Sequence, residues 1–335
     1  MTRLLLGSLL ASLSTACFAV TKVVTTTPDL ASIVAAVGGK YVSVSAIVVG
    51  ARDPHRIEAK PSYMSKVSGA DLFIAIGLDL EVGYERPILA GSRNSKVAIG
   101  ASGHVYASDW VQVLEKPTGQ VSRAMGDIHP GGNPHIWLDP YNGRIIATKI
   151  ASVLTKIDRA HSKEYQANLA EFLRRLDVAM FGAQAEERFG AQKLWEWQRS
   201  GTLLAKLDEN RARNSLGGWA AKMAPHEGKP IVTYHRSFSY FANRFRLRVV
   251  GELEPKPGLE PTPGHLASVI KTVQQSGVKA IVLETFYSPK HAQLVASRTG
   301  AKVVQVPQNV GHVSEARDYI ALFDVIVNRI AEGLK

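Results

Sequence analysis

The run DLFIAIG at residues 71–77 decides the fold class of this chain. It places five consecutive apolar residues between an acidic residue and a glycine. Such a short apolar run is typical of a strand buried on both faces, because neither face offers polar side chains to water. Around it, strand-like stretches alternate with helical ones, the former at 22–26, 41–49 and 96–99 and the latter at 29–37 and 61–69. This alternation predicts an α/β fold in which helices cover both faces of a parallel sheet.

The same alternation returns in the second half of the chain. Strand-like stretches lie at 230–234, 247–253, 278–283 and 301–306, and helical ones at 237–244, 263–277, 289–299 and 315–334. Between the two blocks, apolar residues recur at helical spacing and predict helices at about 141–157 and 162–187. The second helix is long enough to join two lobes, although its periodicity fits an ordinary surface helix equally well. A chain of 335 residues fits two domains. We therefore predict lobes at 20–160 and 190–335, with a linker helix at 161–189.

The first 19 residues have the composition of a secretion signal. Arg3 supplies the positive charge, residues 4–13 are apolar, and the tripeptide CFA at 17–19 is a suitable cleavage site. The apolar stretch is too short for a permanent membrane anchor. Cys17 could instead carry a lipid, but Ser14 stands where such signals usually have leucine, so simple cleavage is favoured. We expect a signal peptide at residues 1–19 and a periplasmic mature protein.

Charge and composition narrow the class of protein further. Lysine and arginine number 40 against 29 aspartates and glutamates, which gives a net charge of +11. The positive residues are scattered rather than clustered with aromatic ones, which favours a solvated basic surface over a nucleic-acid interface. The hydrophobic content of 45% and charged content of 21% are typical of a globular protein. We expect a monomer that binds no nucleic acid.

Three histidines stand in backbone contexts that suit a metal site. His55 and His135 end the near-identical tripeptides DPH (53–55) and NPH (133–135), and His235 ends the β-branched run IVTYH. Proline stiffens the chain on both sides of its own peptide bond, which holds the first two imidazoles in place. Cys17 is the only cysteine and lies in the predicted signal, so a metal site must use His, Asp or Glu. Zinc accepts such a set of three or four N and O ligands.

The predicted strands also suggest where these residues meet. In open α/β sheets, ligands bind beyond the carboxyl ends of the strands. His235 and Glu284 each follow such a strand, and His55 lies in the loop after 41–49. We predict a metal site of His55, His135 and His235 with Glu284 as the fourth ligand. Glu284 could instead cap the next helix or pair with Lys290, and the fourth position could be taken by His312, His129 or water.

Three ordered motifs, with a further familiar segment at 254–258, give the chain a family resemblance. They are DPH at 53–55, GNPHIWLDP at 132–140, YHRSF at 234–238 and EPKPG at 254–258. In these motifs the chain resembles the metal-binding receptors of bacterial ABC importers for zinc and manganese, the cluster A-I (cluster 9) solute-binding proteins. The likeness spans nearly the whole of the predicted mature chain.

The resemblance implies two Rossmann-like lobes joined by one long rigid α-helix, with the metal site in the cleft between them. It carries His55, His135 and His235 over as ligands. A histidine at the third position is similar to zinc receptors, whereas manganese receptors tend to have glutamate there. The family usually has Asp or Glu near the position of Pro307, but residues 306–309 read VPQN here, so the fourth ligand stays open.

The function expected from this resemblance is a periplasmic zinc receptor, not an enzyme, that delivers Zn²⁺ to an ABC importer permease in the inner membrane. A receptor for Mn²⁺ is the alternative within the family. A zinc hydrolase is the alternative outside it, because three histidines and a water also form a catalytic set. In that case Glu284 would be the general base.

Overall fold

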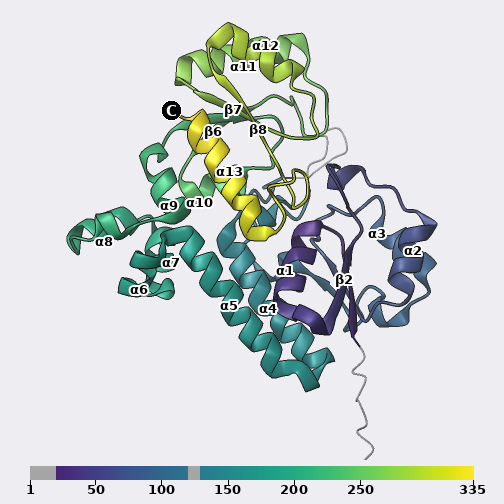
Figure 1. The fold of residues 1–335 in the computed structure, drawn as a ribbon. Coiled ribbons are helices and arrows are strands. Elements are labelled where there is room, and N and C mark those ends of the chain that lie inside the picture. The colour runs from purple at the N-terminus through teal and green to yellow at the C-terminus, as the bar shows by residue number, and fades with distance from the viewer. Residues whose placement is uncertain (1–19, 120–128) are drawn as a thin grey trace, which may run out of the picture.

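The computed structural model describes residues 20–119 and 129–335 (Figure 1). The predicted signal peptide, including Cys17, lies outside these residues. The described strands form two separate four-stranded sheets in which all neighbouring strands are parallel. The predicted α/β fold with parallel sheets is therefore confirmed.

The two sheets share one topology. The first has the order β2-β1-β3-β4 and the second the order β6-β5-β7-β8. Their strands are β1 (Thr21–Thr25), β2 (Val42–Ala46), β3 (Leu72–Ala75), β4 (His104–Tyr106), β5 (Pro230–Thr233), β6 (Arg248–Glu252), β7 (Ala280–Glu284) and β8 (Lys302–Val306). In the first sheet the chain adds β2 on one side of β1 and then β3 on the other side, so the strand order reverses between β1 and β3. In the second sheet it reverses in the same way between β5 and β7. The carboxyl ends of the strands at such a switch point form the crevice in which α/β proteins bind ligands.

Helices pack on both faces of each sheet and between the sheets. They are α1 (Pro28–Gly38), α2 (Pro61–Ser68), α3 (Glu85–Ser92), α4 (Pro140–Ile157), α5 (Ser162–Phe181), α6 (Ala183–Phe189), α7 (Ala191–Ser200), α8 (Leu203–Glu209), α9 (Gly218–Met223), α10 (Ser239–Phe245), α11 (Pro263–Ser276), α12 (Lys290–Thr299) and α13 (Tyr319–Gly333). Figure 1 shows α4 and α5 side by side, with α5 running from α1 toward α9. A long helix therefore contacts elements of both halves. In the described part of the chain, no helix combines the length and apolar character needed to cross a bilayer.

The hydrophobic cores explain why the inner strands of each sheet are apolar on both faces. In β1, Val23 belongs to a central core and its neighbour Val24 to an outer one; in β5, Ile231 and Val232 divide in the same way. Successive side chains of a strand point to opposite faces, so both faces of each sheet are covered. The central core is continuous from the first sheet through α4 and α5 to α13. This central core therefore connects the two halves of the molecule.

Several predicted elements differ in the structure. The strand expected at 96–99 is a short 3-10 helix, η3 (Ser95–Val97), because the Asn94 side chain accepts from the Lys96 amide and closes a turn. The edge strand is β4 instead, whose His104 stacks on Phe73 at 5.6 Å between ring centroids.

The helix expected at 162–187 is divided in two. It ends at Phe181, where Gly182 has φ of +81° and α6 begins. A Cβ on Gly182 would lie 2.7 Å from the backbone of Gly217, whose amide donates to the Phe181 carbonyl. Glycine is required where these two segments of the chain approach each other closely, and its positive φ interrupts the helix. The closing helix α13 likewise begins at Tyr319 rather than Glu315, because the side chain of Asp318 caps it.

Candidate metal centre

The structure brings three of the predicted ligands to one point. His55 lies in the 3-10 helix η2 (Pro54–Arg56), His135 precedes η6 (Ile136–Leu138), and His235 follows β5. One ligand atom from each histidine lies within 4.8 Å of the others, and the ring centroids are 5.2 to 5.4 Å apart. The His135 and His235 residues are buried, and the His55 side chain is only 9% exposed. These separations leave room for one metal ion among the rings.

Each of the three rings is held through its Nδ1 atom. Nδ1 of His55 is 2.9 Å from Oδ1 of Asp53, and Nδ1 of His135 is 2.9 Å from Oδ1 of Asn133. Nδ1 of His235 is 2.7 Å from Oε2 of Glu254. An acceptor at Nδ1 assigns the ring proton to that atom, so Nε2 carries the lone pair that a metal would bind.

The first residue of each tripeptide, and not only the proline, holds the histidine in place. Asp53 Oδ1 also accepts from the backbone amide of His55, and Asn133 Oδ1 accepts from that of His135. One side-chain oxygen thus holds both the backbone and the ring of the histidine two residues later. The signal was present in the motif, since Asp and Asn are the residues that make this turn. The role of Glu254 had no such local signal.

One atom of the cluster lacks any partner. Nε2 of His135 is buried and makes no hydrogen bond. Burial, followed by the nearby His55, holds the pKa of His135 well below its usual value, so this ring is neutral. A buried acceptor without a partner is costly, and a bound cation would satisfy it. The donor set therefore fits a metal.

Charge around the cluster is arranged by the carboxylates. Burial alone would lower the pKa of His235, but the hydrogen bond and charge of Glu254 outweigh it and raise the pKa. Burial alone would raise the pKa of Asp53, but the hydrogen bond and charge of His55 outweigh it and lower the pKa. Asp53 and Glu254 therefore increase the negative potential at the rings they hold, which favours a cation.

The other predicted ligands lie around this group. Glu284 ends β7, is fully buried and is not part of the group of three. Its Oε1 accepts from the Ser237 hydroxyl, its Oε2 has no partner, and burial raises its pKa to about 7. Nε2 of His129 lies 3.2 Å from Nε2 of His55, and burial lowers the pKa of His129 to about 4. His312 is buried beside Phe286, and neither of its ring nitrogens has a partner.

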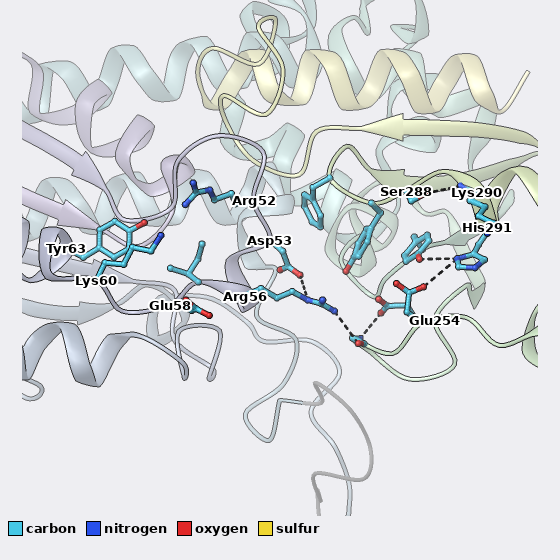
Figure 2. A pocket seen from close by; sticks show the side chains of 16 residues that line it. Arg52, Asp53, Arg56, Glu58, Lys60, Tyr63, Glu254, Ser288, Lys290 and His291 are labelled. Atoms are coloured by element: carbon cyan, nitrogen blue, oxygen red, sulfur yellow. Dashed lines mark hydrogen bonds and ion pairs between the residues drawn. The ribbon is translucent and has the colours of Figure 1, made fainter.

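Two cavities adjoin the cluster. A small one of about 40 Å³ is lined by His129, His135 and His235, so it reaches the rings directly. A larger cleft of about 880 Å³ is lined by residues of both halves, including Asp53 and Glu254 (Figure 2). The cleft therefore lies on the side of the carboxylates that hold the rings.

Known proteins similar to this chain share its architecture. A family model described as "Zinc-uptake complex component A periplasmic" (ZnuA) matches residues 23–187 and 207–333. The metal ABC transporter substrate-binding lipoprotein FimA of Streptococcus parasanguinis is 26% identical over 316 residues, covering 93% of this chain and 89% of FimA. The manganese ABC transporter substrate-binding lipoprotein PsaA of Streptococcus pneumoniae is also 26% identical, covering 93% of this chain and 88% of PsaA.

A solved structure supports the fold. A crystal structure of ZnuA superposes with a TM-score of 0.67 at 22% identity, covering 95% of this chain and 100% of that one. At this identity the likeness establishes the fold alone. The family match, in contrast, spans most of both halves. It confirms the resemblance predicted from the motifs, and the chain belongs to the ZnuA family of metal-binding ABC solute-binding proteins.

Proposed function

We propose that this chain is the receptor of an ABC-type metal importer and that it captures Zn²⁺ between its two lobes for delivery to a membrane permease. The observation that carries the proposal is the convergence of His55, His135 and His235, each with Nδ1 held by an acceptor. This arrangement aims three Nε2 lone pairs at one point, which suits tetrahedral zinc.

We propose Glu284 as the source of the fourth ligand, through its unpartnered Oε2. Its place at the carboxyl end of β7, next to β5, supports this choice. Ser237 donates to Oε1 only, so the lone pairs of the buried Oε2 stay available to a metal. His129 is the second candidate for this position, since its Nε2 already lies near His55.

Zinc is preferred over manganese as the cargo because of the donor chemistry. Three neutral imidazoles suit zinc, whereas manganese favours carboxylate, carbonyl and water oxygens. The related proteins are named for both metals, PsaA for manganese and ZnuA for zinc. The histidine at position 235 supports the zinc alternative.

Calorimetry on the metal-stripped mature chain tests the proposal. We expect one Zn²⁺ per chain with submicromolar affinity and Mn²⁺ binding at least about tenfold weaker. His135→Ala should abolish tight binding, whereas His161→Ala, a histidine remote from the site, should not. Absence of zinc binding at micromolar concentration would exclude the function, and tighter Mn²⁺ than Zn²⁺ binding would reassign the cargo.

The cellular location and domain boundaries belong to the same proposal. We place the mature protein outside the cytoplasm after removal of residues 1–19, as a monomer with lobes at 20–160 and 190–335 and the linker at 161–189. The lipoproteins among the relatives make the Cys17 alternative worth testing. Mass spectrometry of the protein purified from its membrane and soluble fractions distinguishes an N-terminus at Val20 from a lipid-modified Cys17.

A further inference from the structure

Arg56 contacts the opposite half of the molecule from a position next to a predicted metal ligand. Its Nη2 donates to the carbonyl of Gly258 at 3.3 Å, and its Nε lies 3.5 Å from Oδ2 of Asp53. Figure 2 shows the Arg56 side chain reaching across the cleft toward the loop that carries Glu254. Asp53 is the residue that holds the ring of His55.

Gly258 connects this contact to His235, another predicted ligand. Its backbone amide donates to Oε2 of Glu254 at 2.8 Å, and the same oxygen holds Nδ1 of His235. Gly258 has φ of +78°, a conformation that glycine adopts without strain. The turn directs the amide inward to the carboxylate and leaves the carbonyl for Arg56. The loop 254–258 is thereby tied to both halves.

A continuous path of contacts therefore runs from one metal-facing ring to another. It passes from His55 through Asp53 to Arg56, and from there through Gly258 and Glu254 to His235. We infer that Arg56 is a positioning residue that latches the two halves together and slows release of the metal. This inference rests on the proposed function, since it assigns a residue that controls the lifetime of the bound state.

The latch should act on release rather than on capture. Arg56 does not belong to the group of ligand atoms, and its side chain is 63% exposed, so its loss leaves the three imidazoles in place. An exposed ion pair and hydrogen bond contribute modestly, which corresponds to an effect of about threefold to tenfold. We infer that the halves must open before the metal leaves, so a contact that opposes opening slows release.

Stopped-flow measurement of zinc transfer to a chelator tests this. In Arg56→Ala we expect zinc release about fivefold faster with an unchanged association rate, and in Arg56→Lys a partial return toward the natural rate. Arg52→Ala is the matched control, because among the described residues the Arg52 guanidinium has no hydrogen-bond or ion-pair partner although it lines the same cleft. Equal release rates in Arg56→Ala and Arg52→Ala would overturn the inference.

A second measurement does not depend on metal binding. Hydrogen exchange on the metal-free protein reports the protection of loop 254–258 directly. Arg56→Ala should accelerate exchange of the Gly258 amide, while Arg52→Ala leaves it unchanged. If the natural protein binds no zinc, the proposed function fails, but the exchange result still decides whether Arg56 holds the loop. Unchanged exchange of the Gly258 amide in Arg56→Ala would refute the latch.

Discussion

Arg244 and Asp139 form a buried, two-pronged ion pair between the two halves of the molecule. Nε and Nη2 of Arg244, on α10, donate to Oδ1 and Oδ2 of Asp139 at 2.8 and 2.7 Å. The same carboxylate caps α4 by accepting from the amide of Tyr141. Asp139 lies four residues after His135, so this pair also fixes the segment that carries a predicted ligand.

Removing Arg244 should therefore destabilise the fold strongly. Arg244→Ala leaves the Asp139 carboxylate buried with one positive partner missing, which typically costs about 3–5 kcal/mol of unfolding free energy. Urea denaturation of the metal-free protein measures this loss. Both Arg244 and Arg199 lie over the Tyr141 ring, but Arg199 does so from an exposed position. Arg199→Ala is therefore the control and should cost less than about 1 kcal/mol. Equal losses in both variants would contradict the prediction.

The two similar tripeptides should respond unequally to exchange of their first residues. Asp53→Asn keeps an oxygen that can hold His55, so zinc affinity should fall by less than about tenfold. In Asn133→Asp the new carboxylate oxygen would face the Glu115 carboxylate and the Arg236 carbonyl, both of which now accept from Asn133 Nδ2. We expect affinity to fall at least about tenfold more than in Asp53→Asn.

Competition with a zinc chelator measures both variants of this pair. Asp53→Ala, which removes the acceptor altogether, sets the scale for loss of ring orientation. Similar affinities in Asp53→Asn and Asn133→Asp would show that the amide contacts of Asn133 do not matter for the site.

Zinc affinity should decline with acid at a higher pH than an isolated imidazole would predict. The metal requires unprotonated Nε2, and the pKa of His235 is raised because Glu254 outweighs the effect of burial. As the pH falls through this raised pKa, protons displace the metal. Glu254→Gln removes the charge and should move the decline to lower pH. Titrations between about pH 5.5 and 8 measure it, and an unshifted profile would contradict the role of Glu254.

Asp29 should make the metal-free protein less stable as the pH rises. This buried carboxyl in α1 accepts from the Asn309 side chain and, at 3.0 Å, from the Val310 amide, across the two halves. Burial, only partly offset by these hydrogen bonds, raises its pKa from 3.8 to about 7. The folded state therefore binds the proton more tightly than the unfolded state. The resulting stability is present below pH 3.8 and is lost as the pH rises toward about 7.

Asp29→Asn provides the comparison for this pH dependence. The variant amide can keep both contacts if the Asn309 amide turns over, and it does not titrate. The difference in urea midpoint between the natural protein and Asp29→Asn should change between about pH 4 and pH 7, in favour of the variant at the higher pH. A difference independent of pH would show that Asp29 does not titrate in this range.

Much of the fold could be predicted because it is encoded locally. The buried run at 71–77 contains β3, whose four residues are all buried, and the strands at 22–26, 230–234 and 301–306 are offset from those observed by a residue or less at each end. The edge strand β4 could not be predicted, since it is only three residues long and its His104 is held by Glu85 and Phe73 from other elements. Likewise, the break at Gly182 depends on its contact with Gly217.

By itself, the sequence determined which histidines are held and how two of them are held. Asp53 and Asn133 act on the residue two positions later, a contact that the local chain can make without the rest of the protein. Only the tertiary structure decided that three rings meet and that Glu254 holds His235. Parallel pairing of β5 with β6 continues past the ends of the strands, where the Leu253 amide donates to the Thr233 carbonyl and the Glu254 amide to the Tyr234 carbonyl. This pairing places the Glu254 carboxylate beside the His235 ring. Partners brought together by sheet register and by packing of two halves leave no mark in local sequence, because their spacing along the chain is set by the elements between them.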